Sequence, residues 1–298
     1  MVNRAITGDV SEPELCVAYF QSADFRSLAP RGQKVRRGIL ERFCINNNDG
    51  EKPYSELQSK HLRLRRDAMM DRPEAANNMI KAVRQVFKYA MKYQDFDRNP
   101  AVAVEYLAGN PDGFHAWTPE EIAQFEDAHP IGTTARLALA LALYTGQRRA
   151  DLVLLGRQHM TSHNGSDWLR FTQQKNIRNK PVHMEIPIAP ELRVVMDATP
   201  MGDMAFLMNG YGRAFTSNGF GNKFRDWCDA AGLPQCSAHG LRKAAAARLA
   251  ELGCTEQEIM SITGHKTSKE IARYTRSANQ RVRAERAIDK MSVKKIGE

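Results

Sequence analysis

The stretch Ala135-Arg-Leu-Ala-Leu-Ala-Leu-Ala-Leu-Tyr144 is apolar on nearly every side of a helix, and it stops at Thr145-Gly146. A helix that is apolar all round is buried when it belongs to a globular protein. Glycine directly after a helix is typical of a C-terminal end, because it adopts the left-handed conformation without strain. The stretch therefore predicts a buried helix at the centre of a domain.

The flanking sequence indicates a mostly helical domain with a small hairpin. Thr118-Pro-Glu-Glu121 combines an N-cap, a proline at the first helical position and a glutamate three residues after the cap, which predicts a helix start. Two strands are predicted over 168–174 and 182–188, with a turn over 176–180, from the alternation of apolar residues. Amphipathic patterns predict further helices at 191–198, 217–230, 239–252, 255–262, 267–274 and 279–291.

The first hundred residues carry helical patterns and few strand signals. Met79, Val83, Phe87, Ala90 and Met91 lie on one predicted helical stripe. Turn-forming residues are densest in the middle of the chain at Gly109-Asn-Pro-Asp-Gly113. We therefore expect a mainly α fold with a small β-sheet or hairpin. Its predicted parts are a helical domain over 1–110, a linker over 111–117 and a second domain over 118–298.

Composition favours a polyanionic partner. The 298 residues include 43 Lys and Arg against 34 Asp and Glu, a net charge of +9, and the basic excess is present in both halves. The five cysteines have neither Cys-x-x-Cys nor zinc-site spacing, and there is no apolar run long enough for a membrane span. These features predict a soluble, cytoplasmic protein without a metal site.

Basic side chains are frequent on the predicted helices of the first domain. A single charged residue is most often part of a solvated face, but a set of them can follow the phosphates of a duplex. The candidates for DNA contact are Arg36, Arg37, Arg65, Arg66, Lys81, Arg84 and Lys88.

Two short stretches near the C-terminus, His239-Gly-Leu-Arg242 and Gly264-His265, together with Tyr274, gather two imidazoles, a guanidinium and a phenol. Arginine offers a fixed fork to phosphate oxygens, histidine exchanges protons near neutral pH, and a tyrosine oxygen can attack phosphorus. The set suits chemistry on a phosphodiester.

These stretches belong to a longer ordered pattern, which resembles that of the tyrosine recombinases, the phage-integrase family. In chain order its elements are Thr145-Gly-Gln-Arg148-Arg-Ala-Asp151-Leu, Lys175, His239-x-x-Arg242, Gly264-His265 and Tyr274. Any one element is weak evidence, whereas five in order are specific. The likeness covers about residues 118–291 as a catalytic domain, and the helical stretch before it resembles the family's core-binding domain.

The resemblance implies a reaction and a role for each residue. Tyr274 attacks a DNA phosphodiester and forms a 3′-phosphotyrosyl link, while Arg148 and Arg242 neutralise the phosphate. His239 is the candidate proton acceptor and His265 the candidate donor to the phosphate. The general acid is Lys175, with Lys180 as a nearby competitor, and Asp151 orients the arginine. No cofactor, ATP or metal is expected, since the energy of the broken bond is kept in the new one.

The expected partners are double-stranded DNA and further copies of the chain, as a homotetramer on two synapsed sites. Accessory DNA-bending or directionality proteins are further candidate partners. Two alternatives stay open at this point. One is a type IB topoisomerase that rejoins the strand it cut, and the other is a DNA-binding regulator that descends from a recombinase and no longer cleaves.

Overall fold

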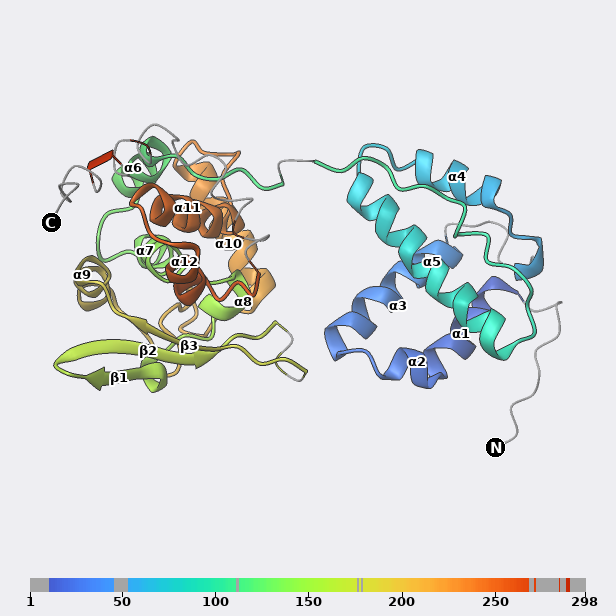
Figure 1. Cartoon of the computed structure of the whole chain (residues 1–298), viewed down its shortest axis with the longest axis horizontal. Coiled ribbons are helices and arrows are strands. Elements are labelled where there is room, and N and C mark those ends of the chain that lie inside the picture. The colour runs from blue at the N-terminus through green and yellow to red at the C-terminus, as the bar shows by residue number, and fades with distance from the viewer. Residues whose placement is uncertain are drawn as a thin grey trace, which may run out of the picture. The chain divides into compact units, whose positions relative to one another are not determined.

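The computed structural model describes residues 11–45, 53–110, 113–175, 177, 179–267, 271, 284, 288 and 289. The chain divides into two compact units, Met1–Gly113 and Phe114–Glu298, and each is described by itself (Figure 1). In the described part of the chain, no helix combines the length and the apolar character needed to cross a membrane.

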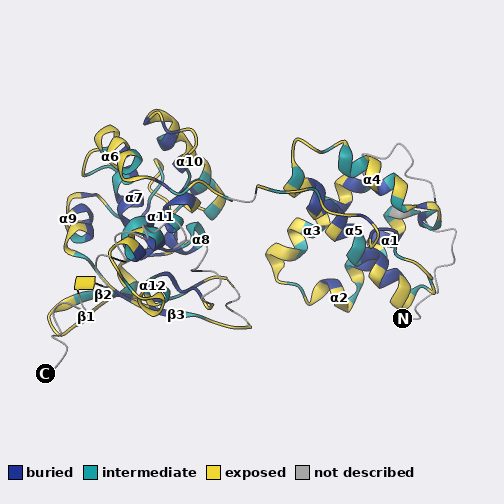
Figure 2. Ribbon diagram, turned by 45° about the horizontal axis from the view of Figure 1, so that its top comes forward, coloured by how far each residue is buried: buried dark blue, intermediate teal, exposed yellow. Residues whose placement is uncertain are grey.

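In its described residues the first unit has helices and, besides them, one isolated β-bridge between Ser11 and Pro53. Its elements are α1 (Glu12–Gln21), α2 (Ala23–Arg26), α3 (Pro30–Ile45), the short 3₁₀ helix η1 (Tyr54–Glu56), α4 (Ser59–Asp67) and α5 (Pro73–Tyr93). The longest, α5, buries Met79, Val83, Phe87 and Ala90 of the predicted stripe, and the stripe's last member, Met91, is exposed. Because α1, α3 and α4 all pack on α5, this helix is the centre of the unit's core (Figure 2).

The second unit surrounds a pair of buried helices with further helices and one sheet. The helices are α6 (Pro119–Ala128), α7 (Thr134–Thr145), α8 (Arg149–Leu152), α9 (Pro190–Ala198), α10 (Ser217–Ala230), α11 (Ala238–Glu251), α12 (Glu256–Thr263) and the 3₁₀ helix η2 (Arg157–His159). Figure 2 shows α7 and α11 largely buried at the centre of the unit, where they pack against each other. Most residues of the helices predicted over 267–274 and 279–291 lie outside the described residues.

The helix α7 confirms the prediction of a buried central helix. Its start is capped by Thr133, whose Oγ1 accepts a hydrogen bond from the N–H of Arg136. It ends at Gly146, which has a φ of 61° and so adopts the left-handed conformation that favours glycine. The side chains of Leu137, Leu139 and Leu141 are buried between these ends.

The sheet is larger than the predicted hairpin. It contains β1 (Met160–His163), β2 (Ser166–Thr172) and β3 (His183–Pro187) in the antiparallel order β1-β2-β3, with Leu169 paired to both Met160 and Ile186. The prediction missed β1 because most of this edge strand is exposed and it lacks apolar alternation. Asn164 and Gly165 both have positive φ in the two-residue turn to β2, and Asn-Gly is a strong hairpin signal that could have revealed the strand.

Replacing Leu139 by alanine tests the importance of the α7 core. Leu139 is 1% exposed, so Leu139→Ala should lower the free energy of unfolding of the second unit by about 2–5 kcal/mol through lost burial and a cavity. All three tryptophans, Trp117, Trp168 and Trp227, lie in this unit, so their fluorescence during urea denaturation reports on it. Leu154→Ala is the matched control at a side chain that is 47% exposed. Equal losses in the two variants would contradict the assignment of α7 as the core.

Candidate active site

The two arginines of the sequence pattern lie at the ends of the buried helices. Arg148 follows α7 and is the N-cap residue of α8, and Arg242 lies in the first turns of α11. Arg242 is only 2% exposed, and its Nη1 donates hydrogen bonds to the carbonyl oxygens of Gly146 (2.6 Å) and Thr263 (2.7 Å). One guanidinium therefore ties together the end of α7 and the end of α12.

Two buried glutamines form a hydrogen-bonded chain that links Arg148 to the Thr263 carbonyl, which Arg242 also binds. Arg148 Nη1 donates to Gln173 Oε1 at 2.9 Å, and Gln173 Nε2 donates to Gln147 Oε1 at 2.7 Å and to the Thr263 carbonyl at 3.0 Å. Gln147 Nε2 in turn donates to the carbonyls of Thr145 and Ile262. Arg148 and Arg242 thus belong to one hydrogen-bonded network around the end of α12.

Sequence reasoning assigned no role to the glutamines or to Thr263. Gln147 stands inside the quoted Thr145–Arg148 motif, which was the available signal. Gln173 follows β2 without any pattern of its own, and only the fold brings it beside Thr263, 90 residues away in the chain.

The end of α12 sets the position of His265. Gly264 is left-handed, with φ of 70°, and an added Cβ there would collide with the Gln173 amide. The next residue, His265, is buried, and its Nδ1 lies 2.7 Å from Thr263 Oγ1. Burial and, next, the charges of Arg242, Arg148 and Lys175 together lower the pKa of His265 to about 3. The ring is therefore neutral at physiological pH.

His239 lies three residues before Arg242 on α11 and keeps an exposed face. Partial desolvation by the surrounding protein lowers the pKa of His239. The charges of Arg242 and Arg148 lower it further, and those of Lys243 and Arg149 have a smaller effect in the same direction. A neutral imidazole that stays open to solvent is able to accept a proton from a bound group.

Asp151 is buried on α8, and the charges of Arg148 and Arg242 act on it. Its Oδ1 accepts a hydrogen bond from the N–H of Gln174 at 2.7 Å. Burial raises the pKa of Asp151, although this hydrogen bond and the charges of Arg148 and Arg242 oppose the rise. The carboxyl group therefore fixes the end of β2 close to the two guanidinium groups.

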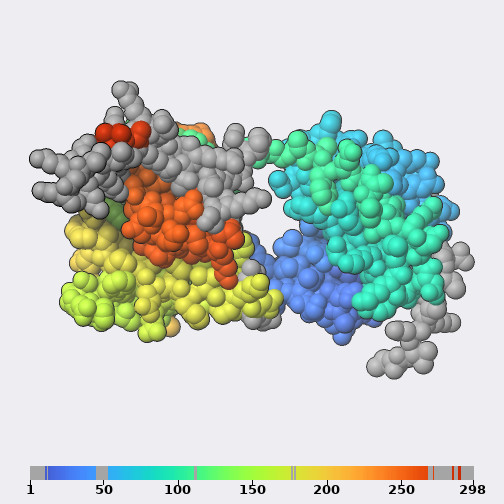
Figure 3. Space-filling view, viewed as in Figure 1, coloured from blue at the N-terminus to red at the C-terminus, as the bar shows by residue number. Residues whose placement is uncertain are grey.

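Lys175 is exposed in the turn after β2 and contributes to the positive potential at His265. Its competitor Lys180 lies across the same turn, where its carbonyl accepts a hydrogen bond from Lys266 Nζ at 3.0 Å. Figure 3 shows α12, in orange, beside the yellow-green sheet, and α12 packs on β3. The structure thus brings Arg148, Arg242, His239, His265 and Lys175 into one region, and the predicted nucleophile Tyr274 lies outside the described residues.

The candidate DNA-contact residues of the first unit differ in their surroundings. Arg84 donates to the carbonyls of Ala101 and Val104, and Arg66 donates to the carbonyl of Glu105, so both hold the chain after α5 in place. The other five comprise Arg36, bound to the Tyr19 hydroxyl; Arg37 and Arg65, over the rings of Phe20 and Phe43; Lys81, near the Tyr106 ring; and the exposed Lys88. Their contact with DNA stays a prediction.

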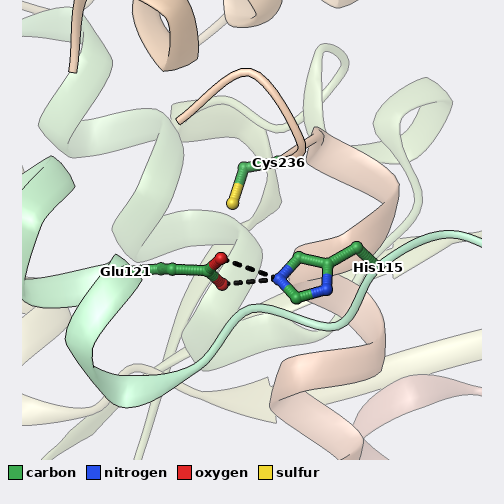
Figure 4. A group of neighbouring side chains, drawn as sticks. All are labelled: His115, Glu121 and Cys236. Atoms are coloured by element: carbon green, nitrogen blue, oxygen red, sulfur yellow. Dashed lines mark hydrogen bonds and ion pairs between the residues drawn. The ribbon is translucent and has the colours of Figure 1, made fainter. Parts of the chain in front are cut away.

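In the described part of the chain, one group of side chains has the types that bind metal ions: His115, Glu121 and Cys236 (Figure 4). His115 Nε2 lies 2.8 and 2.7 Å from the two carboxylate oxygens of Glu121. These are hydrogen-bond distances, shorter than the roughly 3.3 Å that separates two ligands on a tetrahedral zinc ion. Glu121 also accepts hydrogen bonds from the N–H of Thr118 and from Gln235 Nε2. The group is a hydrogen-bonded cluster.

Gly264→Ala tests the close approach of Gln173 to the end of α12. The positive φ alone should cost the alanine variant about 1–2 kcal/mol of stability. The loss should exceed this value, because the added methyl group displaces the Gln173 amide and disturbs the Arg148 hydrogen bond. Gly212→Ala is the matched control, with a φ of 68° and no atom within 4 Å of the added Cβ. Urea denaturation of both variants gives the comparison, and equal losses would show that Gln173 yields without cost.

The buried His265 predicts acid sensitivity. The pKa of His265 in the fold, about 3, lies below its ordinary value of about 6.5. The stability that comes from burying the neutral ring is therefore complete above about pH 6.5 and is lost as the pH falls toward 3. By pH 4 the loss is on the order of 3 kcal/mol. His265→Asn should flatten the dependence of unfolding free energy on pH between 7 and 4, whereas His163→Asn, at an exposed position of β1, should not. Parallel curves for the wild type and His265→Asn would refute this origin.

The comparisons with known proteins agree with this geometry. The model of the Phage integrase family matches residues 118–281, more than half of the chain. No curated protein matches the sequence significantly.

Among solved structures, a lambda integrase tetramer bound to a Holliday junction matches 89% of this chain and 77% of its own, with a TM-score of 0.75 and 18% identity. A structure of the Tn1549 transposon integrase in complex with circular intermediate DNA matches 93% of this chain and 99% of its own, with a TM-score of 0.70 and 18% identity. The resemblance seen in the sequence is confirmed: the chain belongs to the phage integrase family, the tyrosine recombinases, which are enzymes that cleave and join DNA strands.

Proposed function

We propose that the protein is a site-specific DNA recombinase that works through a 3′-phosphotyrosyl intermediate. The observation that carries the proposal is the network in which Arg148 and Arg242, 94 residues apart, converge on the carbonyl of Thr263 beside two neutral imidazoles. Paired guanidinium groups stabilise the negative charge that gathers on phosphate oxygens in a transition state. Most of the network is buried, so it is preorganised for that task.

In the first step, the Tyr274 oxygen attacks phosphorus and the bond from phosphorus to the 5′ oxygen breaks. A phenol with its ordinary pKa of about 10 is mostly protonated at neutral pH, so it needs a base. His239 takes the phenolic proton, for which its neutral, solvent-facing ring is suited. Lys175, in the exposed turn after β2, gives a proton to the leaving 5′ oxygen. A 5′ hydroxyl from another strand then reverses these transfers and joins the new strand.

His265 donates a hydrogen bond to the phosphate in this proposal, and the fold restricts how it can do so. The Thr263 hydroxyl lies 2.7 Å from both the Ile259 carbonyl and His265 Nδ1, and it has a single proton. For the neutral ring to carry its proton on Nε2, the threonine proton must go to Nδ1. In the structure, however, the hydroxyl donates this proton to the Ile259 carbonyl, so Nδ1 carries the ring proton. His265 therefore becomes a donor through Nε2 only when the Thr263 hydroxyl turns its proton to Nδ1.

Strand exchange between two duplexes needs four cleavages, so we infer a homotetramer on two synapsed sites of double-stranded DNA. The lambda integrase tetramer bound to a Holliday junction supports this inference by its fold. The helical first unit, with basic side chains on α3, α4 and α5, is proposed as a core-type DNA-binding domain, and the second unit as the catalytic domain. Asp151 supports the arginines without contacting DNA.

Covalent trapping tests the proposed nucleophile. The probe is a pool of nicked duplexes with a randomised central region, from which a short cleaved strand diffuses away and leaves the protein attached to DNA. The wild-type chain should give a complex that resists SDS, and Tyr274→Phe should give none because the attacking oxygen is missing. Tyr211→Phe is the control at a tyrosine that is 90% exposed.

The outcome separates the alternatives. If the wild type binds the pool without covalent product, the protein is a DNA-binding regulator. Duplexes that the protein has trapped are recovered from the pool and supplied in pairs. If the cleaved DNA is rejoined only to the strand it came from, the activity is that of a topoisomerase. Strand exchange between the duplexes is the result expected for a recombinase.

Neighbouring arginines give a matched test of the phosphate clamp. Arg148→Lys keeps the charge but loses the planar fork, so the rate of covalent complex formation should fall by about 10²–10³-fold, as for loss of a transition-state donor. Arg149→Lys, at the next residue, should change the rate by less than about threefold. Similar losses in both variants would indicate a general electrostatic effect.

A further inference from the structure

Residues 114–117, named here the entry segment, lead into α6 and lie against the start of α11. The indole Nε1 of Trp117 donates a hydrogen bond to the carbonyl of Ser237, the N-cap residue of α11, at 2.9 Å. Lys243 Nζ, on the second turn of that helix, donates to the carbonyl of Phe114 at 2.8 Å. The entry segment is therefore tied to α11 at both of its ends.

Between these ties, the backbone of the entry segment packs directly on the helix. A Cβ added at Gly240 would collide with the carbonyl oxygen of His115 and lie 3.0 Å from the Trp117 ring. Only glycine leaves room for this approach. Gly240 is the residue between His239 and Leu241, so the contact lies next to the proposed proton acceptor.

The hydrogen-bonded cluster of Figure 4 fixes the middle of the entry segment. His115 bonds the Glu121 carboxylate, which also caps α6 through the N–H of Thr118 and accepts from Gln235, two residues before Ser237. Burial alone would raise the pKa of Glu121, but these hydrogen bonds and the charge of His115 together lower it. The carboxylate thus connects the entry segment, the start of α6 and the chain that enters α11.

At the first residue of the segment, the Phe114 ring lies against the His239 imidazole, with 4.5 Å between ring centroids and 56° between ring planes. The Phe114 side chain is 56% exposed, so it contributes little to the core. Its main packing partner among the described rings is His239. An imidazole at the first turn of a helix has few neighbours to fix its χ angles, and a ring against one face supplies such a restraint.

We propose that Phe114, held by the entry segment, is a positioning residue that sets the orientation of the His239 ring for proton transfer. The inference rests on the proposed function of His239 as the proton acceptor. Phe114 acts through His239 and does not itself meet the phosphate. The same contact keeps water from one face of the imidazole. Arg242, Lys243, Arg148 and Arg149 are the charged groups that act on the ring.

Histidine NMR tests the contact without DNA. In the full chain with labelled histidine, the His239 ring signals are assigned by their disappearance in His239→Asn. Phe114→Ala should abolish the ring-current shift of these signals and raise the pKa of His239 toward its ordinary value, because water reaches the uncovered face. Phe114→Tyr should retain both properties. Unchanged His239 signals in Phe114→Ala would overturn the inference.

Covalent trapping then tests the consequence for the reaction. Phe114→Ala should lower the rate of complex formation by at least tenfold and move the acidic limb of its pH profile to higher pH, since a base with a raised pKa is neutral only at higher pH. Phe114→Tyr should restore the wild-type rate and profile. Tyr211→Ala, which removes another exposed aromatic ring, is the control and should change neither. An unaltered rate and profile in Phe114→Ala would overturn the positioning role.

A second variant reaches the same contact from the helix. Alanine stabilises a helix relative to glycine by about 1 kcal/mol, so Gly240→Ala should raise stability if helix propensity alone mattered. Displacement of the His115 carbonyl predicts instead a loss of stability and the same change in the His239 signals as in Phe114→Ala. Raised stability with unchanged His239 signals would contradict the proposal. If the wild type gives no covalent product, the proposed function fails, whereas the NMR result still decides the contact.

Discussion

A guanidinium group buried inside the second unit is the constraint on which the site depends. A charged group in a protein interior is costly unless hydrogen bonds and opposite charge compensate it. Arg242 meets this condition through the carbonyls of Gly146 and Thr263, which are available because α7 and α12 both end there with a left-handed glycine. The helix ends therefore serve as acceptors, and their position fixes where the charge lies.

The same arrangement explains the state of the neighbouring histidines. Burial makes a positive charge on His265 unfavourable, and the two arginines and the lysine close to it add to the effect, so the ring stays neutral far below neutral pH. His239 has the same arginines as neighbours but an exposed face, and its pKa is also lowered. One region thus combines fixed positive charge, which suits a phosphate, with neutral imidazoles, which suit proton transfer.

Much of this could be predicted from particular residues. The apolar run before Gly146 identified the central helix, Thr118 and Glu121 identified the start of α6, and alternating residues identified β2 and β3. The strand β1 lacks the apolar alternation that reveals a strand, and the exposure of Met91 depends on what lies opposite in the fold. Periodicity reports a face of an element but not whether another element covers it.

The sequence by itself determined the helical fold class, the family and the identity of the candidate residues, because these follow from local patterns and from the order of motifs along the chain. Only the tertiary structure decided that Gln147, Gln173 and Thr263 connect the two arginines, and that Phe114 lies on His239. These contacts join residues 21 to 125 positions apart. Hydrogen bonds and ring contacts act over a few ångströms, so they exist only once folding has brought such distant residues together.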